Sequence, residues 1–144
     1  MKLFGKKEPV QKETGNEAIK VLGGGCANCH ALEDAAKAAL EELGLRDAFV
    51  LATKCRALTK AEMEAELAAS LKNLRTDHIE LYQFHNPSME DLKKILAPGG
   101  SMEVLLEAKA KGVVGHIGLT AHLAAVFEAA LEVPEIETIM FPYN

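Results

Sequence analysis

The reactive side chains of this sequence follow short apolar segments. In chain order these residues are Cys26 and Cys29, then Lys54 and Cys55, then His85, and last Thr120 with His122. Thiolates attack disulfides or bind metal ions, while lysine and histidine donate protons or stabilise negative charge. If the apolar segments are neighbouring parallel strands, the loops after them open at one edge of the sheet. The sequence therefore predicts a site at that edge.

The apolar segments have strand length, and stretches of helical periodicity separate them. Strands are predicted at 18–22, 48–53, 78–84, 114–120 and 137–142. Strands that alternate with helices favour right-handed crossovers and a mostly parallel sheet. The predicted fold class is α/β, with five mostly parallel strands forming a partial (β/α)8-barrel-like or open sheet.

The helices between these strands have recognisable starts and apolar faces. Thr59 with Glu62 forms a capping box, and Ser88 can cap a short helix. One helical face is predicted from Leu32, Ala36, Ala39, Leu40 and Leu43, with Gly44 at its end, and another from Met63, Leu67, Leu71 and Leu74. A third helix, capped by Ser101, is expected to turn Met102, Leu105 and Leu106 inward.

Composition limits the possible functions. The 144 residues suffice for one domain, 49% are hydrophobic, and the net charge is −5. There is no basic stripe, and only 5% of residues are aromatic, which argues against a nucleic-acid partner. No apolar run is long enough to span a membrane and no signal peptide is evident. Three cysteines are an odd number and two of them stand three positions apart, which is not a disulfide framework, so we expect a reduced, cytoplasmic protein.

From residue 48 onward the sequence resembles the aldo/keto reductase family. The similar segments are Val50-Leu-Ala-Thr-Lys54, Ser70-Leu-Lys-Asn-Leu-Arg-Thr-Asp77, Ile79-Glu-Leu-Tyr-Gln-Phe-His85, His116-Ile-Gly-Leu-Thr120 and Phe141-Pro-Tyr-Asn144. In that family these segments form the third to sixth strands of an eight-stranded barrel. The resemblance implies a barrel enzyme that transfers hydride from NADPH to an aldehyde or ketone.

The resemblance also implies roles for three residues. Lys54 matches the family's active-site lysine and His85 its active-site histidine, while Thr120 stands where the family has a serine that contacts the nicotinamide amide. Hydride attack on a carbonyl builds negative charge on oxygen, which calls for a nearby proton donor and a cation. Lys54 and His85 are thus the predicted catalytic residues, and Thr120 is the predicted cofactor-binding residue.

Several parts of the family's site are replaced here. Neither Tyr82 nor Tyr143 matches the family's proton-donating tyrosine, and Tyr82 is predicted to be a core residue. Ala121 stands where asparagine is usual. The chain ends at Asn144, before the two strands that bind the NADP phosphates in the family. We therefore expect weak NADPH binding and a truncated reductase whose turnover is in question.

The segment at 18–45 resembles the first strand and helix of small thioredoxin-like proteins. It places Cys26 before a helix and Cys29 one turn later, where the helix dipole favours a thiolate. The predicted organisation is a flexible lead-in at 1–17, this unit at 18–45, and a partial reductase barrel at 48–144, with the last two in one compact domain. The alternative function is a dithiol–disulfide protein that uses Cys26 and Cys29.

A third interpretation is a zinc-binding or structural fragment. Cys26, Cys29 and Cys55 could bind zinc together with a histidine, although no second C-x-x-C is present. The expected partners are a small carbonyl substrate or a protein disulfide, without nucleic acid or membrane. Because five strands cannot close an eight-stranded barrel, two sheet edges stay open, and we expect a homo-oligomer.

Overall fold

The computed structural model describes residues 50–142 continuously and, before them, residues 21–22, 35, 38–39, 42 and 44. The predicted lead-in at 1–17, the cysteines at 26 and 29, and the last two residues lie outside the described residues.

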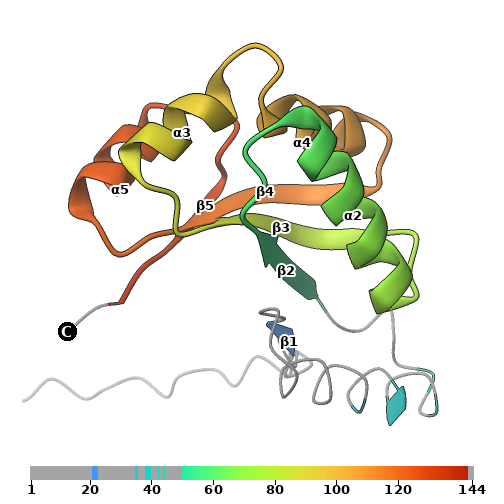
Figure 1. Ribbon diagram of the computed structural model, residues 1–144. Coiled ribbons are helices and arrows are strands. Elements are labelled where there is room, and N and C mark those ends of the chain that lie inside the picture. The colour runs from blue at the N-terminus through green and yellow to red at the C-terminus, as the bar shows by residue number, and fades with distance from the viewer. Residues whose placement is uncertain are drawn as a thin grey trace, which may run out of the picture.

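The described strands form one parallel sheet, as predicted (Figure 1). They are β1 (Val21–Leu22), β2 (Leu51–Cys55), β3 (Ile79–His85), β4 (Val114–Thr120) and β5 (Thr138–Met140). Their order in the sheet is their order in the chain, and each neighbouring pair is parallel. This arrangement is an open segment of a barrel wall, with the predicted strands displaced by three residues or fewer.

Four described helices cover one face of this sheet (Figure 1). They are α2 (Lys60–Leu74), α3 (Met89–Leu96), α4 (Ser101–Ala110) and α5 (Ala124–Leu131). Within the range predicted as an earlier helix, the described positions 35, 38, 39 and 42 are helical. Gly44 follows in a turn at φ +64°, the left-handed conformation expected of a glycine that ends a helix.

Two of the three predicted caps are present. The prediction for Ser101 is wrong, because Ser101 is the first residue of α4, the N-cap is Gly100 and no side chain caps this helix. The Thr59 hydroxyl accepts from the backbone N–H of Glu62 at 3.3 Å, and the Glu62 carboxylate accepts from the Thr59 N–H at 3.0 Å. Ser88 and Asp91 form the same reciprocal pair at the start of α3. Helices α2 and α3 begin within five residues of the ends of β2 and β3, so these strand ends and helix starts share one edge of the sheet.

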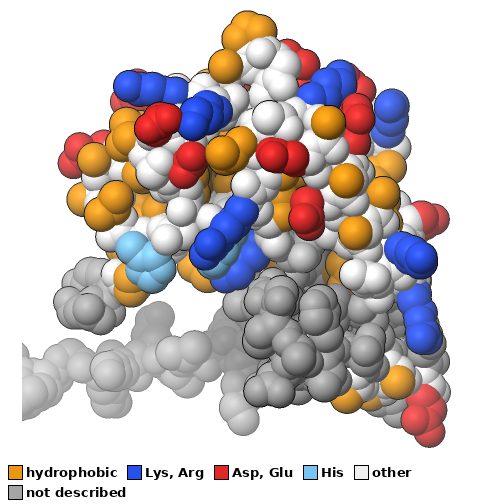
Figure 2. Space-filling view, in the orientation of Figure 1, with side chains coloured by type: hydrophobic (Ala, Val, Ile, Leu, Met, Phe, Trp, Pro, Cys, Tyr) orange, Lys and Arg blue, Asp and Glu red, His pale blue; other side chains and the backbone are white. Residues whose placement is uncertain are grey.

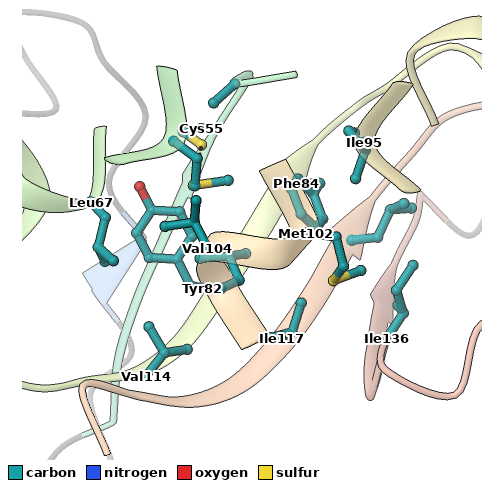
Figure 3. Packing of buried hydrophobic residues seen from close by; sticks show 14 of the residues in the cluster. Cys55, Leu67, Tyr82, Phe84, Ile95, Met102, Val104, Val114, Ile117 and Ile136 are labelled. Atoms are coloured by element: carbon teal, nitrogen blue, oxygen red, sulfur yellow. Dashed lines mark hydrogen bonds between the residues drawn. The ribbon is translucent and has the colours of Figure 1, made fainter. Parts of the chain in front are cut away.

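The core lies between the sheet and the helices (Figure 3). Tyr82, Phe84, Ile117 and Leu119 alternate along β3 and β4, and each is 1% exposed or less. Met63 of α2 and Leu105 of α4 are fully buried against this face.

One predicted helix face is wrong in part. Met102 and Leu105 of α4 are buried, but Leu106 is 38% exposed, and Val104 and Ala108 take the inward positions. At about 100° per residue the buried positions of α4 fill one arc of the helix, and Leu106 lies outside that arc, beyond Met102.

Candidate functional site

The parallel register brings the three residues predicted for the site to one edge of the sheet. Lys54 lies opposite Gln83, His85 opposite Thr120, and Thr120 opposite Met140. Because side chains alternate along a strand, Lys54, His85 and Thr120 belong to the face that the described helices leave uncovered. In a closed barrel this face is the interior, where a substrate reaches the carboxyl ends of the strands.

His85 is held by its neighbour across the strand pair. Its Nδ1 lies 3.2 Å from the Thr120 hydroxyl oxygen. The same hydroxyl oxygen accepts from the backbone N–H of Asn86 at 3.2 Å, and that N–H also reaches the Thr120 carbonyl at 2.7 Å. Thr120 is only 7% exposed. In the described part of the chain, the Thr120 hydroxyl therefore forms hydrogen bonds with His85 and Asn86.

The charges around His85 are positive. Partial burial lowers its pKa, and the positive charges of Lys54, Arg56 and His122 lower this pKa further. The lowered pKa favours the neutral ring, in which one nitrogen is a donor and the other an acceptor. Figure 2 shows basic and histidine side chains side by side over the region where β2 ends. A neutral imidazole beside cations is suited to hold a polarised carbonyl oxygen.

Cys55 does not join this edge, contrary to our expectation. It follows Lys54 in β2 and so belongs to the opposite face, where its Sγ lies 3.8 Å from Met63 Sδ. The side chain is 8% exposed, and burial raises the pKa of its thiol. Strand alternation, which the prediction did not apply to adjacent residues, explains the difference.

The zinc interpretation finds no support in the described residues. Nowhere in that part of the chain do three His, Cys, Asp or Glu side chains gather closely enough to hold a metal ion. Cys26 and Cys29 lie outside it.

Tyr82 is a core residue, as predicted. It is 0% exposed, and its hydroxyl lies 3.2 Å from the Ser70 hydroxyl, on the helix side of the sheet. Burial raises its pKa well above the ordinary value, so it is a poor proton donor. Two further histidines make contacts elsewhere: His78 Nδ1 is 2.7 Å from the Gly112 carbonyl, and His116 Nδ1 is 3.3 Å from Glu137.

Asn86 is the residue that sequence reasoning missed. No role was predicted for this residue, which follows the strand predicted at 78–84. In the structure Asn86 has φ +50°, and its Oδ1 accepts from the backbone N–H of His122 at 3.2 Å. The available signal was an asparagine, a residue that tolerates the left-handed region, placed directly after the site histidine.

The parallel α/β fold agrees with the comparison to known proteins. The sequence pattern of the aldo/keto reductase family matches residues 27–144. This chain belongs to the aldo/keto reductase family.

Individual relatives support this assignment. Aldo-keto reductase YhdN of Bacillus subtilis is 31% identical over 116 residues, which are 74% of this chain and 34% of that protein. Methylglyoxal reductase DkgB of Salmonella typhi is 33% identical over 102 residues, covering 69% of this chain and 37% of that protein. The holo form of an aldo-keto reductase from Bacillus halodurans superposes with a TM-score of 0.63 at 30% identity, over 77% of this chain and 37% of that one.

The family match reaches further toward the N-terminus than the resemblance seen in the sequence. The family match begins at residue 27, not 48, and so runs through most of the segment assigned to a thioredoxin-like unit. A fused thioredoxin-like unit therefore has no support. The chain spans about a third of the length of the curated relatives it matches. In the described residues, no helix is both long and apolar enough to cross a membrane.

Proposed function

We propose that this chain carries the Lys54 and His85 part of a reductase site, which acts in NADPH-linked reduction of a small aldehyde or ketone. The observation that supports it best is the register of the sheet, which sets Lys54, His85 and Thr120 on one face at the carboxyl ends of three adjacent strands. Methylglyoxal, which gives the DkgB relatives their name, is the carbonyl compound to try first.

The chemistry asked of these residues is charge stabilisation. A neutral His85 can donate one N–H to the carbonyl oxygen of a substrate and fix its orientation while Thr120 holds the other ring nitrogen. Lys54 adds a positive charge on the same face, which lowers the energy of the alkoxide that forms on that oxygen. NADPH, when bound, would supply the hydride.

The described residues fit one end of such a cofactor better than the other. The polar groups at the strand ends suit the reacting end. The described helix starts are less suited to bind the cofactor's phosphates, because α2, α3 and α4 each carry acidic residues in their first turn. These residues are Glu62, Glu90, Asp91 and Glu103. Negative side chains at a helix start oppose a bound phosphate. We therefore expect NADPH binding weaker than micromolar.

The test is NADPH consumption with methylglyoxal at saturating cofactor. We expect slow turnover that falls at least tenfold in His85→Ala and in Lys54→Met, within the range typical of lost acid–base or charge stabilisation. Lys60→Met is the matched control, because Lys60 pairs with Glu107 on the helix layer. Absence of any NADPH-dependent turnover in the unaltered chain, or equal losses in the control, would refute the proposal.

The dithiol alternative is not favoured, and the same assay separates it. If Cys26 and Cys29 carried the activity, Cys26→Ser would abolish disulfide reduction, and carbonyl turnover would be absent from the start. We expect Cys26→Ser to leave NADPH-dependent carbonyl reduction unchanged.

A further inference from the structure

Asn86 adopts a backbone conformation that most residues avoid. Its φ of +50° lies in the left-handed region. A non-glycine residue there carries strain, although asparagine tolerates it better than most residues do. Pro87 follows, and a proline further restricts the residue before it. Such strain persists only where surrounding contacts enforce it.

The contacts that enforce it join two strand ends. The Asn86 N–H donates to the carbonyl of Thr120 at 2.7 Å and lies 3.2 Å from its hydroxyl oxygen. The Asn86 side chain then accepts from the N–H of His122 at 3.2 Å. One residue after β3 therefore binds both Thr120, the last residue of β4, and the loop that follows it.

The loop after β4 is held in part by this contact. Helix α5 begins after Leu123, whose side chain cannot cap it, and no side-chain cap is present at its start. Ala121 is tied to β5 through its N–H, which donates to the Met140 carbonyl at 3.1 Å. The next N–H, that of His122, donates to the Asn86 side chain. The amide oxygen must face this N–H, so the Nδ2 group is directed away from it.

We propose that Asn86 is a positioning residue for His85. Its left-handed backbone turns the chain directly after His85, and its three hydrogen bonds hold Thr120 and the following loop at a fixed distance. The Thr120 hydroxyl in turn stays on Nδ1 of His85. The relevance to catalysis rests on the proposed function, but the positioning itself does not.

A simple strand breaker would behave differently. If Asn86 served only to turn the chain, glycine would do as well or better, since it adopts positive φ without strain. If the Asn86 side chain also positions His85, substitution by glycine must disturb His85 and substitution by aspartate must not. Aspartate tolerates the left-handed region and keeps an acceptor oxygen for the His122 N–H.

The test follows the two ring nitrogens of His85 by nitrogen-15 NMR, at a pH where the ring is neutral. In the unaltered chain and in Asn86→Asp we expect one dominant tautomer, with well separated Nδ1 and Nε2 shifts. Asn86→Gly keeps the backbone N–H that binds Thr120 but loses the acceptor for the His122 N–H, so the two shifts should converge as the loop after Thr120 is released. Arg75→Gly is the matched control, because Arg75 has φ +49° at the end of α2.

Two results would overturn the proposal. One is a folded Asn86→Gly protein with the shifts of the unaltered chain; the other is a similar convergence in Arg75→Gly. The NMR pattern is independent of turnover. A chain without carbonyl reduction but with the expected shifts would refute the proposed function and leave the role of Asn86 standing.

Discussion

Glu137 is expected to fasten the edge strand β5 to the rest of the fold. Its carboxylate pairs with Lys109 of α4, accepts from the Ile117 N–H of β4 at 3.2 Å, and lies 3.3 Å from His116 Nδ1. Its own N–H donates to the Ile117 carbonyl at 2.8 Å. The side chain is 32% exposed, so these contacts are partly shielded from water.

The hydrogen bond from Lys109 is the largest cause of a Glu137 pKa of about 2, against an ordinary value of 4.5. A difference of that size corresponds to about 3 kcal/mol of stability if it acts in full. Solvent screening at a side chain with this exposure reduces the expected contribution to about 1–2 kcal/mol. Because the folded pKa is depressed, this stability is present above pH 4.5 and is lost as the pH falls toward about 2.

Two variants of Glu137 separate the contribution of its charge from that of its hydrogen bond to the Ile117 N–H. Glu137→Gln keeps an acceptor for the Ile117 N–H and loses only the charge, so we expect a loss of about 1 kcal/mol at pH 7. Glu137→Ala also leaves that N–H without its acceptor, which adds about 1 kcal/mol. Glu107→Gln, in an exposed pair with Lys60, is the control and should cost clearly less than Glu137→Gln, because water screens an exposed ion pair.

The assay is urea unfolding of each variant between pH 2 and 7, the window set by the pKa of Glu137. The difference between the unaltered chain and Glu137→Gln should be constant above about pH 5 and shrink toward zero near the folded pKa. A difference that does not depend on pH, or equal losses in Glu137→Gln and Glu107→Gln, would refute this reasoning.

Four further outcomes follow from the structure. Lys54→Met and His85→Ala should change the unfolding free energy by less than about 2 kcal/mol, since strand-end side chains bury little; a greater loss in chemical denaturation would mark them as core residues. Gly100→Ala should lose at least about 3 kcal/mol in the same measurement, because the added carbon would lie 2.3 Å from the Ile95 carbonyl oxygen; near-equal stability would contradict this close packing. The Cys55 thiol should resist a thiol reagent in the native chain and react on unfolding, because it is buried and its pKa is raised. Finally, we propose that the edge beside β5, where Met140 and Phe141 are 42% and 50% exposed, pairs with a second copy of the chain, and a monodisperse monomer in light scattering would exclude it.

The alternation of strands and helices was predictable from the sequence. The strands coincide with mostly apolar segments bounded by turn residues. Two of the helices begin at a capping box, one at Thr59 and one at Ser88. These signals are local, since a cap is formed by residues three apart. Parallel pairing followed, because strands joined by helical crossovers have few other arrangements. That Lys54, His85 and Thr120 share an edge could therefore be stated in advance.

The tertiary structure decided which side of the sheet each neighbour faces and which groups touch. Cys55 and Lys54 are adjacent in the chain, yet one packs on Met63 and the other lies on the open face, because the register fixed the direction of every side chain along β2. The bond between Asn86 and His122 joins residues 36 apart. A contact between residues so far apart in the chain forms only after β3 and β4 have paired, so no local pattern in the sequence could predict it.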